Sequence, residues 1–239
     1  KPVKLTLYAT IAILIGGVVQ IVPTLMVESN IPYIEAVKPY SPLELEGRDI
    51  YISNGCVSCH SQMIRPFRSE VERYGEYSKA GEFVYDHPFL WGSKRTGPDL
   101  HRVGGKYNDS WHFNHMYDPQ STSPGSIMPA YQWIIKNKLD KSQTEKKMRA
   151  MITLGVPYTE EDVKNAQKSM DEQGMKIQEN LYEDPDFASN YDASKKYAKA
   201  NDIPFVEMKD REIVALIAYL QRLGVDIKVN DVKEKLSKK

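Results

Sequence analysis

Apolar residues are concentrated in one uninterrupted stretch near the N-terminus. Residues 5–27 read LTLYATIAILIGGVVQIVPTLMV and include no charged side chain. A run of about 23 residues is long enough for one helical crossing of a bilayer with some tilt. The pattern predicts a transmembrane anchor over residues 1–30, in which Pro23 is expected to kink or end the helix towards its far side.

A cleaved signal peptide is the competing interpretation of this stretch. Its apolar region should be shorter and should precede a small-x-small cleavage site, whereas this run continues Met26-Val27-Glu28. We therefore favour an uncleaved anchor. Lys1 and Lys4 precede the span and Glu28 follows it, so the positive-inside rule predicts a cytoplasmic N-terminus. Since Lys1 is not a methionine, we expect a few residues to precede it.

The next helical pattern follows a short linker. Residues 31–40 have two prolines and no clear period, which predicts an extended connection. Ser41 can then cap a helix that reaches about Ser53, with Pro42 in its first turn and Glu44 favourably placed at its N-terminus. This helix leads directly into the segment that contains both cysteines of the chain.

A second amphipathic helix is predicted over residues 210–223. In DREIVALIAYLQRL, Ile213, Ile217 and Leu220 recur at helical spacing, and Gly224 is expected to end the helix.

Between these helices, residues 165–204 are polar and predict a solvated helical insertion, with a surface for another subunit as the alternative. Thr159 and Asp162 form a capping-box pattern, a helix is expected over 192–200, and residues 225–239 are a charged tail.

Composition narrows the class of protein. The chain has 239 residues, a formal net charge of zero and a pI near 7.1. This balance gives no sign of a nucleic-acid partner. The mean hydropathy of −0.51 indicates that most of the chain faces water, outside the predicted anchor.

The clearest chemical motif is Cys56-Val57-Ser58-Cys59-His60. Two thiols at this spacing followed by an imidazole are typical of c-type haem attachment, in which Cys56 and Cys59 bond the haem and His60 ligates iron. A redox CxxC pair would be expected near a βαβ pattern, and a structural zinc site would need further ligands at short spacing. The next histidine is His87, so we expect one covalently bound haem c.

The surrounding pattern resembles c-type cytochromes. Residues 96–101 read TGPDLH, similar to the Gly-Pro-x-Leu segment of that family, in which the proline carbonyl accepts a hydrogen bond from the axial histidine. By this resemblance Pro98 supports His60, while Gly47, Tyr51 and Tyr219 resemble the residues at which the two terminal helices cross. The expected fold is mainly α: one transmembrane helix, then a cytochrome c-like domain over 41–224 with a helical insertion.

The second axial ligand is less constrained by sequence. The candidates within reach are Met63, His87, His101, His112, His115, Met116 and Met128. Met128 is favoured because it follows a Pro/Gly/Ser-rich stretch, on a loop of the kind that holds the ligating methionine of c-type cytochromes. Bis-histidine ligation through His101 or His112 is the main alternative, and it would give a lower reduction potential.

A longer resemblance is to the mono-haem subunit of cbb3-type cytochrome c oxidases. The similar segments are MIRPF (63–67), RYGEYS (73–78), DHPF (86–89), WGSKR (91–95) and LGVPYT (154–159). The resemblance implies a bacterial inner-membrane subunit with a periplasmic haem domain. It would pass electrons from a di- or tri-haem cytochrome subunit to the catalytic haem-copper subunit. It also implies that a haem c takes the place of a dicopper centre, so no copper is expected.

Other assignments are less specific. Arg65 and Arg95 are candidates for binding haem propionates or for a subunit interface, with plain surface charge as the alternative. Trp91 and Trp111 are expected at the haem edge or in the core. A self-sufficient haem enzyme such as a peroxidase, or a free-standing anchored electron shuttle, are the alternative functions. The peroxidase would need an open sixth position with His101 or His112 as a distal group.

Overall fold

The computed structural model describes residues 1–27, 32–92 and 94–227, and in these ranges it is mainly helical with no β-strand. An isolated bridge joins Lys138 and Arg211. The elements are α1 (Pro2–Met26), α2 (Pro42–Ser53), η2 (Cys56–Ser58), α3 (Arg68–Tyr74), η3 (Ala80–Phe83), α4 (Asp109–Tyr117), α5 (Pro119–Thr122), α6 (Gln132–Lys136), α7 (Thr144–Thr153), α8 (Glu160–Lys164), α9 (Ala166–Tyr182), α10 (Pro185–Ala200), η4 (Met208–Asp210) and α11 (Glu212–Arg222). The predicted mainly α class is confirmed.

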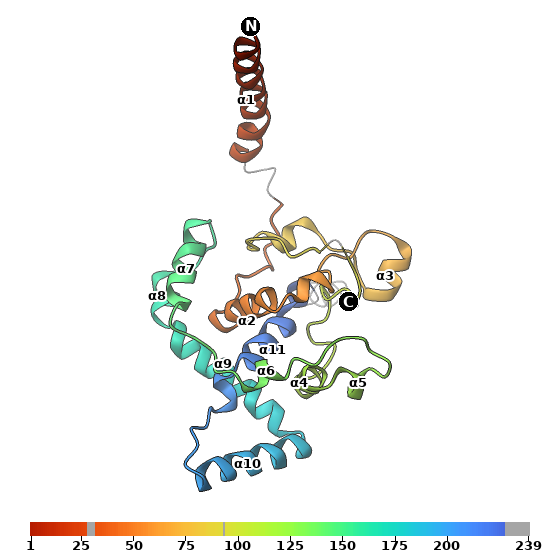
Figure 1. Ribbon diagram of the computed structural model, residues 1–239, viewed down its shortest axis with the longest axis vertical. Helices are drawn as coiled ribbons and strands as arrows, with labels where there is room; N and C mark the ends of the chain where they lie inside the picture. Colours follow the sequence, from red (N-terminus) through yellow and green to blue (C-terminus); the bar gives the residue numbers. More distant parts are fainter. Residues whose placement is uncertain (28–31, 93, 228–239) are drawn as a thin grey trace, which may run out of the picture.

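Helix α1 stands clear of the other helices (Figure 1). The most apolar 18-residue window of its segment Pro2–Thr24 has a mean hydropathy of 2.1, and no residue of that window is buried inside the protein. Such a helix is long and apolar enough to cross a bilayer. Pro23 lies inside its last turn, and the helix continues to Met26. Residues 28–30 of the predicted anchor lie outside the described residues.

Helices α2 and α11 cross at the centre of the domain (Figure 1). Gly47 faces the backbone of Ala215 so closely that a Cβ at Gly47 would overlap the Ala215 carbonyl. The rings of Tyr51 and Tyr219 lie 5.5 Å apart beside this contact. Ser41 caps α2 by a capping box with Glu44. The predicted crossing is therefore present, and it depends on the close approach of Gly47 to Ala215 and Tyr219.

The segment predicted as a solvated insertion contains α9 and α10. Helix α9 buries Met170, Gly174, Ile177 and Leu181 and packs against α2, α4 and α11. The predicted solvated insertion is helical, but its solvation is corrected for α9, because these apolar positions recur on one face of an otherwise polar helix. Helix α10 starts at Pro185, earlier than the helix expected over 192–200, because Asp184 caps it.

A smaller apolar cluster joins α2 to α7 and α8. Leu45 packs with Met148, Met151 and Val163, all of them buried. The predicted capping box of Thr159 and Asp162 is present at the start of α8. Most of the predicted tail, residues 228–239, lies outside the described residues.

Candidate haem site

The attachment motif follows directly from the end of α2. Gly55 adopts a left-handed conformation (φ 71°), which turns the chain into the short helix η2. The turn is closed by a 2.9 Å hydrogen bond from the His60 amide to the Cys56 carbonyl. Both thiols are free, Cys56 half-buried and Cys59 exposed. Burial raises the pKa of Cys56 to about 11, so its sulfur is held as a neutral thiol.

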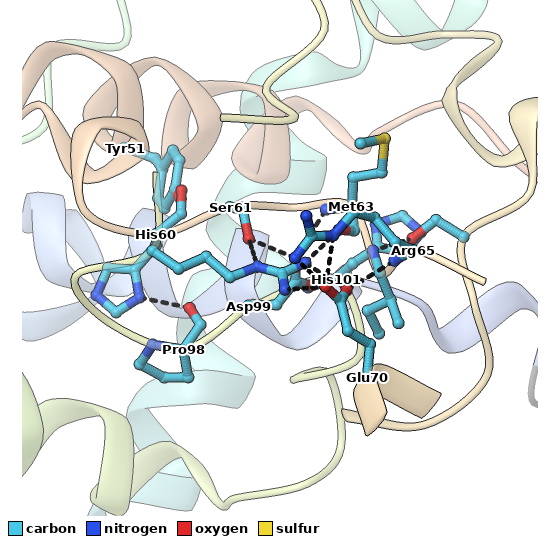
Figure 2. Close-up of polar contacts among 12 residues, drawn as sticks. Tyr51, His60, Ser61, Met63, Arg65, Glu70, Pro98, Asp99 and His101 are labelled. Carbon is cyan, nitrogen blue, oxygen red and sulfur yellow. Dashed lines mark hydrogen bonds and ion pairs between the residues drawn. The ribbon is translucent and has the colours of Figure 1, made fainter. Parts of the chain in front are cut away.

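His60 is oriented by a backbone carbonyl. Its Nδ1 lies 2.9 Å from the carbonyl oxygen of Pro98, and Figure 2 shows the ring facing that proline. Because a carbonyl can only accept, Nδ1 carries the proton and Nε2 keeps its lone pair. Burial lowers the pKa of His60, an effect that the bond to Pro98 partly opposes. The imidazole is thus held neutral, the form in which it binds metal.

The chain on either side of Pro98 is fixed to the motif by further hydrogen bonds. The Gly97 amide donates to the Cys59 carbonyl (2.9 Å), and the Leu100 amide donates to the Ser61 carbonyl (2.8 Å). Gly97 is required by the close approach, since a Cβ at this position would overlap the His60 ring. The backbone of 97–100 therefore determines where the imidazole lies.

Asp99 secures the same junction through its side chain. Its Oδ2 accepts hydrogen bonds from Ser61 Oγ (2.6 Å) and the Met63 amide (2.9 Å), and its Oδ1 accepts from the His101 amide (2.9 Å). Figure 2 shows Asp99 among these donors, next to the Pro98 contact. A fully buried carboxylate with this many donors rigidifies the segment that orients His60.

A cavity of about 590 Å³ opens beside the motif. Its volume falls in the range of roughly 300–1,000 Å³ that is typical of cofactor sites. Cys56, Cys59, His60 and Pro98 form part of its wall. The apolar part of the wall includes Tyr51, Leu100, Val103, Met116, Ile127, Met128, Tyr131, Leu216 and Leu220.

The candidates for the second axial ligand differ in whether they line the cavity. Met128, Met116, His112 and His115 line it, whereas Met63, His87 and His101 do not. The ring of His101 is instead buried against Phe83, and its Nε2 lies 2.8 Å from Glu82 Oε2. This position removes His101 from the candidate ligands. Met128 lies on the loop that joins α5 to α6.

Two histidines of α4, His112 and His115, line the cavity and differ in their hydrogen bonding. His115 Nδ1 lies 2.7 Å from Thr122 Oγ1, and its ring stacks on Trp111. His112 is buried, and its Nε2 has no hydrogen-bond partner among the described residues. Burial lowers the pKa of His112 to about 4, so this imidazole is neutral near pH 7.

The two arginines singled out from the sequence do not line the cavity. Arg95 donates to Ser61 Oγ, the Met63 carbonyl and Glu70, and lies 3.3 Å from Asp99. Arg65 is half exposed and pairs with the same Glu70. Their charges are therefore matched by carboxylates of the protein, and this geometry does not favour them as propionate partners.

Tyr107 is a residue of the cavity wall that the sequence did not single out, whereas Trp111, expected at the haem edge or in the core, and His115, a candidate ligand, also line the cavity. Tyr107, Trp111 and His115 form a stacked column, with ring centroids 3.9 and 4.6 Å apart. The positions 107, 111 and 115 share a helical spacing, which is the signal that could have linked them. Trp91 instead stacks on Phe89, away from the cavity wall. The cationic wall residues are Arg73, Arg102 and Lys106.

These residues fit a covalently bound haem. The two thiols and a neutral imidazole with a free Nε2 share one wall, an apolar chamber adjoins them, and Gly97 leaves room for the ring of His60. Together with helix α1, this arrangement defines the class as a membrane-anchored c-type haem protein.

The chain belongs to the family described as cytochrome c oxidase, mono-heme subunit/FixO, whose sequence model matches residues 1–227. This is the mono-haem subunit of cbb3-type oxidases, in agreement with the resemblance found from the sequence, and it ties the chain to respiratory electron transport in a membrane. No match was found among curated proteins.

Proposed function

We propose that this chain is the electron-transfer subunit of its oxidase and carries a single haem c. Cys56 and Cys59 are the attachment residues, His60 is one axial ligand and Met128 is the other. A bound haem c would supply one-electron Fe(III)/Fe(II) chemistry, and His60 and Met128 are the residues that would hold its iron. No copper is required for this role, and oxygen is reduced in another subunit.

The observation that carries the proposal is the meeting of three separate segments on one cavity wall. His60 follows α2, Pro98 belongs to the segment hydrogen-bonded to the motif, and Met128 lies on the loop before α6. His60 presents a neutral Nε2 because its Nδ1 proton is engaged by Pro98. A thioether is a soft ligand that needs no deprotonation, and it favours the reduced metal.

The protein around the cavity controls water and orientation. Leu100, Leu216 and Leu220 make its wall apolar, which restricts water beside a bound group. Asp99 and Arg95 hold the segment 61–63 against 97–100, so His60 keeps its orientation when charge on the bound group changes. A site with little rearrangement between two charge states is suited to electron transfer rather than to substrate turnover.

The finer assignments of partner and topology follow from the family and from α1. We infer that electrons arrive from a di- or tri-haem cytochrome subunit and leave for the catalytic haem-copper subunit. With Lys1 and Lys4 on the cytoplasmic side, the haem domain lies in the periplasm of a bacterial inner membrane. Of the two candidate distal groups of a self-sufficient peroxidase, His101 is buried against Phe83 outside the cavity, which leaves only His112 in the cavity wall.

The test is a redox-resolved absorption spectrum of the haem-loaded full chain and of Met128→Ala. We expect the oxidised wild type to show the weak long-wavelength band of a thioether–iron bond, and the variant to lack it. The reduced wild type should resist carbon monoxide, whereas the variant should bind it. Met116→Leu is the matched control, because Met116 lines the same cavity and its loss should leave the band unchanged. A band that survives Met128→Ala would refute this ligand assignment.

A further inference from the structure

The charged residues of the cavity wall leave an excess of positive charge. Among the described residues, the wall has one carboxylate, Asp99, and three cationic side chains, Arg73, Arg102 and Lys106. Asp99 is already surrounded by donors from Ser61 and Met63 and by Arg95, which does not line the cavity. It is therefore not available to balance the cations of the wall.

One of the three cations is neutralised inside the protein. Arg102 donates from Nη1 and Nη2 to the two carboxylate oxygens of Glu82, at 2.6 and 2.8 Å. This buried pair is bidentate, and its guanidinium also donates to the carbonyls of Glu76 and Tyr77. Arg102 is thus fully engaged, and it contributes no free charge to the cavity.

The other two cations are not matched in this way. Neither Arg73 nor Lys106 takes part in an ion pair within the ranges that the structure describes. Each lies instead over a tyrosine that also lines the cavity: the Arg73 guanidinium is 5.1 Å from the Tyr74 ring centroid, and Lys106 Nζ is 5.3 Å from that of Tyr107. Cation–π contacts of this kind hold the two charges against tyrosines of the cavity wall.

We propose that Arg73 and Lys106 bind the two carboxylates of the cofactor. This inference rests on the proposed function, because a haem c brings two propionates to the cavity. Two unpaired cations from distant segments, α3 and the turn before α4, match these two negative charges. A carboxylate at an otherwise apolar cavity needs such partners, and Arg73 can form a bidentate pair. The pair takes the role that the sequence suggested for Arg65 and Arg95.

The experiment is a redox titration of the haem-loaded full chain in detergent, at a fixed pH and ionic strength. The variants are Arg73→Gln, Lys106→Gln and the charge-retaining Arg73→Lys. The control is Arg68→Gln, which removes the same charge from the same helix at an exposed residue that pairs with Glu72 and does not line the cavity. Haem attachment is measured by the absorbance of the denatured haemochrome, and the ligand set by the thioether–iron band.

We expect Arg73→Gln and Lys106→Gln to lower the midpoint potential more than Arg68→Gln does. The reason is that an unscreened propionate stabilises the oxidised, more positive haem. Arg73→Lys should remain close to wild type. The proposal is overturned if the potentials of both glutamine variants equal that of the Arg68 control. Failure of haem attachment or absence of the thioether band in wild type would instead refute the proposed function.

Discussion

The imidazole of His60 is held by Pro98, thirty-eight residues further along the chain, through a 2.9 Å contact between Nδ1 and the proline carbonyl. Gly97 makes this contact possible, because its missing side chain leaves the space that the imidazole ring occupies. The relationship joins the attachment motif to a second segment, and it fixes both the tautomer and the direction of the ligand.

Gly97→Ala should therefore disturb the axial ligand without removing it. The added methyl overlaps the His60 ring, which must rotate or move away from Pro98. We expect a lower yield of attached haem and a larger high-spin fraction in the oxidised spectrum. The measurements are the haemochrome absorbance per mole of protein and the visible spectrum. Wild-type values in both would show that the ring has more room than this contact allows.

Gly47→Ala tests the crossing of α2 and α11. A Cβ there overlaps the Ala215 carbonyl, so the helices must separate around Tyr51 and Tyr219. Overpacking of this kind costs about 1–3 kcal/mol of folding free energy. A denaturant titration of the haem-loaded protein measures the loss.

Gly16→Ala is the matched control for Gly47→Ala, since a Cβ at Gly16 meets nothing within 4 Å. Equal stability of the two variants would contradict the prediction that the crossing requires glycine.

The sequence predicted these elements because each has a local signature. Each of these signatures is contained in a short stretch of sequence. They are the capping box of Ser41 and Glu44, the apolar spacing of α11, and the spacing of Cys56, Cys59 and His60. The contact of Pro98 with His60 was reached only through resemblance to c-type cytochromes. Physically, a carbonyl acceptor has no side-chain signature of its own.

Features that depend on contacts between residues far apart in the chain could not be predicted from the sequence. Arg65 and Arg95 were predicted to bind propionates or to lie at a subunit interface, yet Glu70 and Asp99 neutralise them in the fold. The sequence did not suggest Arg73 as a cofactor-binding residue, because Arg73 lines the cavity only once the fold brings α3 close to the attachment motif. Similarly, the buried face of α9 comprises few apolar residues among many polar ones, and its partners lie on distant helices.

Asp99→Ala should lower stability more than any change at an exposed aspartate. It removes the acceptor of Ser61 Oγ and of the Met63 amide, and it takes one partner from Arg95. Since each hydrogen bond to a charged group contributes about 1.5–3 kcal/mol, we expect a loss of at least about 3 kcal/mol. Chemical denaturation measures this loss.

The control for Asp99 is Asp140→Ala, an exposed carboxylate outside the cavity wall. The variant should unfold close to the wild-type midpoint. If Asp99→Ala did the same, water would have replaced the carboxylate at no cost, contrary to its burial.

His112 should make stability depend on pH in a mildly acidic window. Burial lowers its pKa to about 4, whereas the unfolded chain titrates near the ordinary value of about 6.5. Between these values the unfolded state binds more protons, so the free energy of unfolding falls as the pH falls. The contribution of His112 is complete above about pH 6.5 and is lost by about pH 4, with an upper limit of about 3 kcal/mol. His112→Asn removes the titrating group, so denaturation midpoints measured from pH 7 to pH 4 should fall less steeply than in wild type. Parallel curves would mean that the imidazole titrates alike in both states, which its burial does not allow.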